Sequence, residues 1–324
     1  MSPARPPEGP ATRAPAADRA FDVVALGEAM VEFNQTVAGQ PNFLQGFGGD
    51  TSNAVIAAAR AGARCAYLTR IGGDAFGQML LQLWAHEGVH TGGVSTARSS
   101  PTGLYFVTHG TQGHEFSYRR ADSAASRMTP RWLEGTPGEI IRAARFLHVS
   151  GISMAISAGA CDTVFEAMAM AREAGTRVAF DANLRLKLWP LARARACIAQ
   201  AVALCDLFLP SREDLQTLTG LSDDAALLDW CHAQGAGAVV LKLGAEGAWV
   251  SQGRQRLRVP GRAATLRDAT GAGDCFSGNL LARLAAGDDL AHAAHYANAA
   301  AALSVQGFGA VAPLPRREAV LAVL

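Results

Sequence analysis

The chain has 324 residues, of which 29 are Lys or Arg and 28 are Asp or Glu, so its formal net charge at pH 7 is +1. A chain this close to neutral has no basic footprint for nucleic acid, and any acidic ligand must be held by a local site. Apolar residues make up 49% of the sequence, which is enough for a large core and excludes a disordered or fibrous protein. No run of about 18 apolar residues occurs, so we expect no membrane partner and a cytoplasmic location.

The first twenty residues are rich in Ala, Pro and Arg. They lack the apolar stretch of about 7–15 residues that a secretory signal needs, and their prolines oppose an amphipathic helix. We therefore expect residues 1–20 to be a disordered tail and residues 21–324 to form the folded part. The six cysteines show no metal-binding spacing, which favours reduced thiols.

Short apolar runs alternate with longer helical patterns along the folded part. Strands of this kind separated by helices predict βαβ crossovers and a mostly parallel sheet covered on both faces, which is a three-layer α/β fold. We expect strands at 21–26, 65–71, 146–149, 177–180, 207–209 and 238–241, and helices at 51–61, 76–87, 158–174, 191–204 and 223–234.

Two regions, 31–47 and 94–120, carry β-type residues without an intervening helix. Within the second, 103–108 and 115–119 flank a glycine-containing turn and predict a hairpin. Strands outside the parallel sheet would form a small sheet that acts as a discontinuous lid. In parallel α/β sheets ligands bind beyond the carboxyl ends of the strands, so we expect the lid to cover a site there.

The segment 268–278 reads Asp-Ala-Thr-Gly-Ala-Gly-Asp-Cys-Phe-Ser-Gly and precedes a helical pattern. Gly271 and Gly273 would leave backbone N–H groups open at a helix N-terminus, where the unpaired donors and the helix dipole favour an anion. Asp274 would lie beside that anion. Phosphoryl transfer needs donors for the developing charge and a carboxylate that accepts a hydroxyl proton. The alternative is that Asp274 only caps the helix.

This segment resembles the second signature of the PfkB (ribokinase-like) carbohydrate kinases, Asp-Thr-x-Gly-Ala-Gly-Asp-x-Phe. The first signature, a Gly-Gly pair followed by Asn, is matched at 48–53, and the resemblance extends over about residues 22–315. It implies a ribokinase-like fold, an anion hole at Gly271, Ala272 and Gly273, and Asp274 as the catalytic base. No Walker A lysine motif and no Gly-x-Gly-x-x-Gly after the first strand are present, so a P-loop kinase and a dinucleotide dehydrogenase are not supported.

At the first signature, Gly49 would bring the backbone close to a ligand while Asp50 and Asn53 grip sugar hydroxyls. The alternative is ordinary capping of the following helix. The runs 46–53, 102–105, 116–120 and 180–185 most resemble 2-keto-3-deoxygluconate kinases. That substrate carries a carboxylate, for which Arg119 and Arg185 are suitable because a guanidinium pairs a carboxylate through two hydrogen bonds.

Hairpin hydroxyls complete the expected sugar pocket. Tyr105 and Tyr118 could donate to the sugar or pack on it, and lid packing or a dimer contact is the plainer alternative. The resembled kinases carry two consecutive tyrosines before the hairpin arginine, where this chain has Ser117 and Tyr118, so Ser117 offers a shorter hydroxyl.

For the nucleotide, the resemblance implies Lys242, Gly244 and Gly247 in the turn after 238–241, although any turn of this kind has a similar pattern. It also implies Asn298 beside the adenine, and Asn183 with Arg185 near the transferring phosphoryl group.

ATP brings Mg²⁺, which binds with few protein ligands. The family's Asn-x-x-Glu motif for the water shell of this metal is replaced here by Ser-Arg-Glu-Asp at 211–214, where Asp214 keeps the carboxylate. The resemblance further implies a monovalent cation such as K⁺ near Asp268, Thr270 and the loop 304–310.

The expected activity is therefore ATP-dependent phosphorylation of the C6 hydroxyl of 2-keto-3-deoxygluconate. Two alternatives stay open at this point: a related kinase for a neutral sugar such as fructose or for another sugar acid, and a non-catalytic sugar or nucleotide sensor on the same fold. The unpaired strand edges of the lid favour a homodimer.

Overall fold

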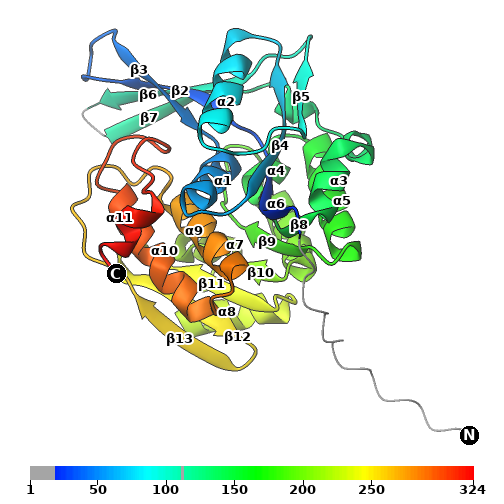
Figure 1. Cartoon of the computed structure of the whole chain (residues 1–324). Coiled ribbons are helices and arrows are strands. Elements are labelled where there is room, and N and C mark those ends of the chain that lie inside the picture. The colour runs from blue at the N-terminus through cyan, green and yellow to red at the C-terminus, as the bar shows by residue number, and fades with distance from the viewer. Residues whose placement is uncertain (1–18, 111–112) are drawn as a thin grey trace, which may run out of the picture.

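A nine-stranded sheet with helices on both faces forms the body of the protein (Figure 1). The computed structural model describes residues 19–110 and 113–324, so residues 1–18 of the expected tail lie outside the described residues. The strand order is β13-β12-β11-β10-β9-β8-β1-β4-β5. The strands are β1 (Phe21–Leu26), β4 (Cys65–Gly72), β5 (Val94–Ala97), β8 (Ala144–Ser150), β9 (Arg177–Asp181), β10 (Leu207–Phe208), β11 (Ala238–Lys242), β12 (Gly247–Gln252) and β13 (Gln255–Pro260).

From β5 across to β11 every neighbouring pair of strands is parallel, while β12 and β13 are antiparallel additions at one edge. The central strands read as continuous apolar runs because both of their faces are covered. The expected three-layer α/β architecture is confirmed, and the six strands expected from the sequence all belong to this sheet.

The helices divide between the two faces according to the two large clusters of buried side chains. One cluster is built with α1 (Asp50–Arg60), α2 (Ala75–His86), α9 (Ala272–Ala286), α10 (Leu290–Ser304) and α11 (Arg317–Leu321). The other is built with α3 (Thr136–Arg142), α4 (Gly151–Ala155), α5 (Ala158–Glu173), α6 (Leu191–Leu204), α7 (Arg212–Thr219) and α8 (Asp224–Ala233), and with the short helices η1 (Ala125–Arg127) and η2 (Pro130–Glu134). A further short helix, η3 (Gly244–Glu246), connects β11 to β12.

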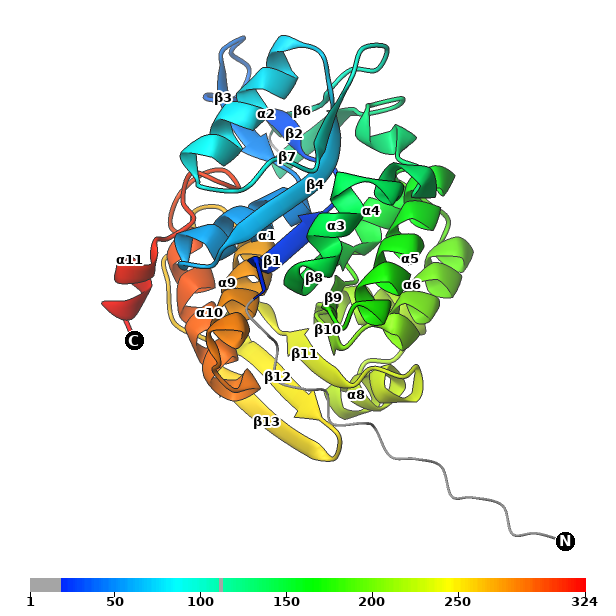
Figure 2. The same ribbon diagram turned by 45° about the vertical axis from the view of Figure 1, so that its right-hand side comes forward.

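A second, four-stranded sheet of order β3-β2-β6-β7 projects from one end of the large sheet (Figure 2). Its strands are β2 (Met30–Gln35), β3 (Phe43–Gly48), β6 (Gly103–Gly110) and β7 (Gly113–Arg119). The predicted hairpin is confirmed as the antiparallel pair β6 and β7, and residues 111–112 of its turn lie outside the described residues.

One strand in the range expected for the lid belongs elsewhere. β5 pairs in parallel with β4, with Val94 opposite Thr69, so it extends the large sheet. The helix α2 between β4 and β5 supplies the crossover that a parallel neighbour requires. The four lid strands are therefore drawn from 30–48 and 103–119 only. In the described part of the chain, no helix is both long and apolar enough to cross a membrane.

Helices α1 and α9 approach each other closely, and Gly278 makes this approach possible. A Cβ added at Gly278 would lie 2.0 Å from the backbone oxygen of Ala54 and 2.9 Å from the Ala57 Cβ. Backbone cannot move aside as a side chain can, so the two helices must separate if the glycine is replaced.

We predict that Gly278→Ala lowers the free energy of unfolding by about 1–3 kcal/mol, the usual range for overpacking a dense core. Chemical or thermal denaturation measures this change. Gly237→Ala is the matched control, because its added Cβ would make only an ordinary contact at 3.4 Å with the Asp206 oxygen. Equal stability of the two variants would contradict the close helix contact.

Candidate active site

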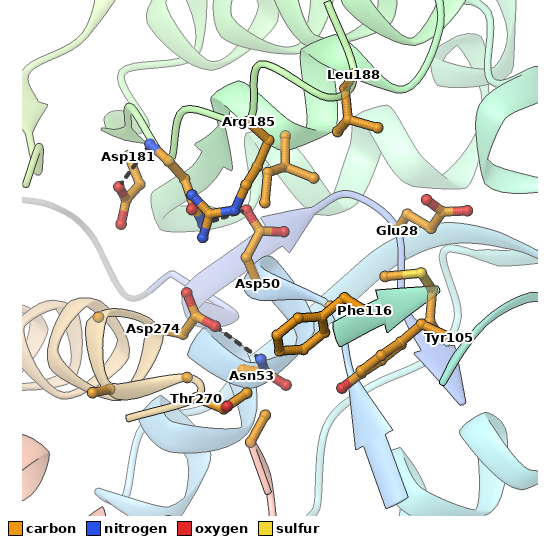
Figure 3. A pocket seen from close by; sticks show the side chains of 18 of the residues that line it. Glu28, Asp50, Asn53, Tyr105, Phe116, Asp181, Arg185, Leu188, Thr270 and Asp274 are labelled. Atoms are coloured by element: carbon orange, nitrogen blue, oxygen red, sulfur yellow. Dashed lines mark hydrogen bonds between the residues drawn. The ribbon is translucent and has the colours of Figure 1, made fainter. Parts of the chain in front are cut away.

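A cavity of about 820 Å³ lies between the carboxyl ends of the large-sheet strands and the lid (Figure 3). The sheet contributes Asp181 at the end of β9, Lys242 at the end of β11 and Glu28 just after β1. The lid contributes Tyr105 and Phe116, and the first turns of α1 and α9 enter from the side. The site therefore occupies the place expected for a parallel α/β sheet.

Asp274 lies in the first turn of α9, directly after the two glycines. Gly271 is the N-cap residue, with φ of 75°, a left-handed conformation that glycine adopts without strain. The Asp274 Oδ2 atom accepts a hydrogen bond of 2.8 Å from Nδ2 of Asn53 on α1. Residues from the two sequence signatures, 221 positions apart, thus meet in one hydrogen bond.

Burial raises the pKa of the Asp274 carboxyl from its ordinary 3.8 to about 7. The charge of Asp50 acts in the same direction, as does that of Asp181, while the Asn53 hydrogen bond and Lys242 oppose the shift. A carboxyl with a pKa near neutrality can both take up and release a proton at physiological pH, which is the property that a general base requires.

Beside Asp274, buried acceptor atoms lack partners. The Asp50 Oδ1 and Asn53 Oδ1 atoms have no hydrogen-bond partner, although their residues are only 7% and 3% exposed. The other oxygen of Asp50 accepts from Nδ2 of Asn183 at 3.0 Å. Because unsatisfied buried oxygens are destabilising, their grouping at the cavity indicates a ligand rich in hydroxyl donors.

Gly49 precedes these acceptors in a conformation that only glycine readily adopts. Its φ is 112°, and a Cβ there would lie 2.3 Å from the backbone oxygen of Glu28. The close approach of the two segments places the start of α1 against the end of β1. Asp50 and Asn53 reach the cavity as a result.

The sequence analysis named hairpin residues of both faces, and only one face of the hairpin lines the cavity. Tyr105 on β6 is directly opposite Tyr118 on β7, and both line the cavity together with Phe116. Side chains alternate between faces along a strand, so Ser117 and Arg119 project from the other face and do not line the cavity. Arg119 donates from Nη1 to the backbone oxygen of Tyr118 at 3.1 Å.

The arginine on the lid side of the cavity is Arg120, one residue further along. It forms an ion pair with Glu28, whose side chain is 1% exposed and also accepts from the hydroxyl of Ser123. The guanidinium carbon of Arg120 lies 5.8 Å from the centre of the Tyr118 ring. Sequence reasoning missed both Glu28 and Arg120, although the two-residue alternation from Tyr118 would have selected Arg120.

The hydroxyl of Tyr105 is directed within the lid. It donates to the carboxylate of Glu32 on β2, which is itself buried. Burial raises the pKa of the Glu32 carboxyl, and the charge of Asp268 adds to this, whereas the hydrogen bond from Tyr105 opposes it. Tyr105 therefore offers the cavity its ring rather than its proton.

At the nucleotide end, the structure divides the four expected residues into two pairs. Lys242 and Gly244 line the cavity. Gly247 and Asn298 are not among the lining residues. A Cβ at Gly247 would lie 2.2 Å from the Val259 oxygen, and Asn298 donates from Nδ2 to the oxygens of Val259 and Pro260 at 3.3 and 3.1 Å. Both residues hold the end of β13.

Arg185 and Asp214 both line the cavity. Arg185 donates from Nη1 to the backbone oxygen of Leu184 at 2.8 Å. Burial raises the pKa of the Asp214 carboxyl, and the Asp181 charge contributes, while Arg185 and Lys242 lower it. In the described part of the chain, no group of three or more His, Cys, Asp or Glu side chains could hold a metal ion.

Asp268 and Thr270 form a turn before α9. The Asp268 Oδ1 atom accepts from the backbone N–H of Thr270 at 2.9 Å and from its hydroxyl at 2.6 Å, and Oδ2 accepts from the Gly309 N–H at 2.9 Å. The carboxylate thus ties the turn to the late loop that contains Gly309. Gly271 in turn packs on that loop, because its added Cβ would lie 3.1 Å from the oxygen of Ala310.

Comparisons with known proteins identify the family. Residues 20–317 match the model of the pfkB family carbohydrate kinases. The chain belongs to the pfkB family of carbohydrate kinases. This pfkB kinase is 33% identical to a 2-dehydro-3-deoxygluconokinase of Thermoproteus tenax, with 93% of this chain and 94% of the relative covered. It is also 33% identical to fructokinase-1 of Oryza sativa subsp. japonica, with 95% and 99% covered.

Solved structures of this pfkB kinase's relatives show the same ribokinase-like fold. A PfkB protein from Polaromonas sp. JS666 superposes with a TM-score of 0.85 at 31% identity, covering 94% of this chain and all of the other. A putative ribokinase II from E. coli, in complex with ATP and Mg²⁺, superposes with a TM-score of 0.85 at 25% identity, covering 93% and 97%. The expected family and fold are confirmed.

The raised pKa of Asp274 predicts a pH-dependent stability. Below about pH 4 the carboxyl is protonated in both the folded and unfolded states, and above about pH 7 it is ionised in both. Between these values the folded state holds a proton that the unfolded state has lost, so this group's contribution to stability falls as the pH rises. Asp274→Asn removes the buried charge, and its melting temperature should exceed that of the wild type increasingly from about pH 4 to 7.

Thermal melts at several pH values measure this difference. Asp229→Asn is the control, since that side chain is 72% exposed. A difference for Asp274→Asn that is constant with pH would contradict the assigned shift.

Proposed function

We propose that this pfkB kinase transfers the γ-phosphoryl group of MgATP to the C6 hydroxyl of 2-keto-3-deoxygluconate. The single observation that carries the kinase chemistry is the position of Asp274. Its buried carboxyl, with a pKa of about 7, lies in the first turn of α9, where helix geometry leaves the first backbone N–H groups without an intrahelical carbonyl partner. Of these groups, the Ala272 N–H donates to the Ala269 oxygen at 3.2 Å in the turn before the helix. The Asp274 carboxyl also lies one hydrogen bond from Asn53, whose carbonyl oxygen is unpartnered.

In this mechanism the sugar hydroxyls bind to Asp50 and Asn53, which places one hydroxyl beside Asp274. The Asp274 carboxylate accepts the proton of that hydroxyl as its oxygen attacks the γ-phosphorus of ATP. The bond from that phosphorus to the bridging oxygen breaks, and ADP leaves. The amides of Gly271, Ala272 and Gly273 stabilise the charge that develops on the transferred group, aided by the α9 dipole. Arg185 orients the transferred phosphoryl group. Asn183 orients the sugar end of the cavity through its hydrogen bond to Asp50.

The residues present fit a nucleoside triphosphate and its metal ion. The N-terminus of α9 favours an anion, and Lys242 and Arg185 supply positive charge at the same end of the cavity. ATP supplies the phosphoryl group, and Mg²⁺ neutralises its oxygens. A Mg²⁺ ion bound to phosphates keeps most of its waters, so one carboxylate such as Asp214 is sufficient from the protein.

The sugar-acid assignment rests on the cations around the sugar. Arg120 and Arg185 both line the cavity, and Tyr118 adds a hydroxyl. A guanidinium pairs a carboxylate in a bidentate manner, which a neutral ketose cannot exploit. The 2-dehydro-3-deoxygluconokinase among the relatives supports the same choice.

A kinase of fructose type is the second candidate, and one observation favours it. The buried Glu28 carboxylate is already paired with Arg120. Glu28 therefore neutralises the positive charge that a sugar carboxylate would need from Arg120. Fructokinase relatives of equal identity agree with it. The two candidates share Asp274 and differ only at the lid end of the pocket.

Three further assignments belong to this proposal. A monovalent cation such as K⁺ would bind beside Asp268 and Thr270, using oxygens of the loop that Asp268 holds. The enzyme would act in the cytoplasm. A homodimer would form through the lid, where Leu44 on β3 is 65% exposed and Phe43 38% exposed.

We predict that Asp274→Asn lowers kcat by about 10²–10⁴-fold, because a positioned base typically contributes this much. The amide keeps the size and the Asn53 contact, so the affinity for ATP and sugar should change little. Steady-state kinetics with calorimetry of each substrate tests both parts. Retention of more than about a tenth of wild-type kcat would contradict the base assignment.

Arg120→Lys separates the two candidate substrates. The ammonium keeps the pairing with Glu28 but loses the bidentate fork, so KM for 2-keto-3-deoxygluconate should rise about tenfold or more and KM for fructose little. Arg119→Ala is the matched control from the other face of β7 and should change either KM less than about twofold. A larger effect of Arg119→Ala, or an equal effect of Arg120→Lys on both sugars, would contradict the sugar-acid assignment.

A further inference from the structure

Asp181, at the end of β9, joins several elements of the site. Its side chain is 5% exposed. The Oδ2 atom accepts from Nζ of Lys242 at 2.5 Å and from the hydroxyl of Ser277 on α9 at 3.1 Å, and Oδ1 accepts from the backbone N–H of Asn183 at 3.2 Å. One carboxylate thus connects β9, β11, α9 and the loop after β9, as Figure 3 shows for its bond to that loop.

The Asp181–Lys242 pair directs the lysine toward the phosphate-binding end of α9. The Lys242 Nζ atom lies 3.6 Å from the position that a Cβ on Gly273 would occupy. A free lysine side chain has several rotatable bonds and about 2 kcal/mol of rotamer entropy, so it does not hold such a position without a partner. The lysine side chain is only 13% exposed, and the pair is therefore largely shielded from water.

Asp181 also acts on the sugar end through Asn183. The bond from the Asn183 N–H to Asp181 stabilises Asn183 in a left-handed conformation with φ of 32°, which is unusual for a residue other than glycine. In that conformation the Asn183 side chain donates to Asp50 at 3.0 Å. The carboxylate of Asp181 therefore supports a contact at each end of the cavity.

We infer that Asp181 is a positioning residue that holds the Lys242 ammonium at the phosphate-binding end of α9, so that nucleotide binding depends on it. The inference rests on the proposed kinase function. Asp181 acts through Lys242 and through its charge, and it takes no part in the transfer itself.

The charges around the pair determine the sign of the effect. The ionisable groups that act on Asp181, Asp274 or Lys242 include Asp50, Asp214, His148 and Arg185. His148 is buried, and burial lowers its pKa, which favours the neutral imidazole. In Asp181→Asn a negative charge disappears near Asp274 and Lys242 loses its counter-charge. Both changes lower the pKa of Asp274.

The first test measures nucleotide affinity and a pH profile of Asp181→Asn. The affinity for adenylyl imidodiphosphate with Mg²⁺, measured by calorimetry without sugar, should fall about tenfold, since a hydrogen bond to a charged group is of this order. The acid limb of the kcat/KM profile should move to lower pH by about one unit, because removing a nearby charge shifts a pKa by one or more units. A merely structural role of Asp181 would lower activity without moving this limb.

The second test combines Asp181→Asn with Lys242→Met. The single Lys242→Met variant leaves the Asp181 carboxylate buried and unpaired, which is strongly unfavourable. If Asp181 acts through Lys242, the double variant binds the same nucleotide analogue at least as tightly as Lys242→Met alone. Losses that multiply in the double variant would overturn the inference.

Asp206→Asn is the matched control. Asp206 accepts from the N–H of Val178 at 2.8 Å at the opposite, amino end of β9 and β10, so the same substitution is made far from the cavity. It should change neither affinity nor the pH profile. If no sugar is phosphorylated by the wild type, the kinase proposal fails. If binding of the analogue and its dependence on Asp181 persist, the positioning role stands without it.

Discussion

The close packing of α1 against α9 is the contact on which the site depends. Gly278 lets the Ala54 backbone approach, and this proximity puts the first turns of both helices side by side. The Asn53–Asp274 hydrogen bond of 2.8 Å is the direct result. The N-terminus of α9, whose dipole favours an anion, and the start of α1, which carries unpartnered acceptor oxygens, thereby face one cavity. The proposed phosphoryl transfer uses that combination.

Three carboxylates, Asp50, Asp181 and Asp274, meet in this cavity with few cations between them. Such a cluster is unfavourable unless each member is hydrogen-bonded or paired. Asn183 donates to Asp50, and Lys242 pairs with Asp181. The pKa of Asp274 is raised chiefly by burial, and the charges of Asp50 and Asp181 raise it further. A carboxyl whose pKa is raised toward neutrality has the property that a base working near neutral pH requires.

The lid adds specificity to this common machinery. Its β6–β7 pairing puts Tyr105, Phe116 and Tyr118 on the cavity side, and continues with Arg120 against the buried Glu28. The family assignment covers kinases of a sugar acid and of a neutral ketose at the same identity. In the proposed function, selectivity between these substrates depends on the lid face, where the Arg120–Glu28 ion pair lies.

The sequence by itself determined the alternation of strands and helices and the family. It also selected Asp274, Asp50 and Asn53, which line the cavity. Apolar periodicity and short glycine motifs are local properties of the chain, so they can be recognised without the fold. Tertiary structure alone decided which hairpin face meets the cavity. The alternation of side chains along a strand does not show which of its two faces will be buried until neighbouring elements cover one of them. It also decided that Gly247 and Asn298 hold the end of β13, that β5 joins the large sheet, and that Asp181 meets Lys242. Each of these depends on contacts between segments distant in the sequence, and no local pattern records them.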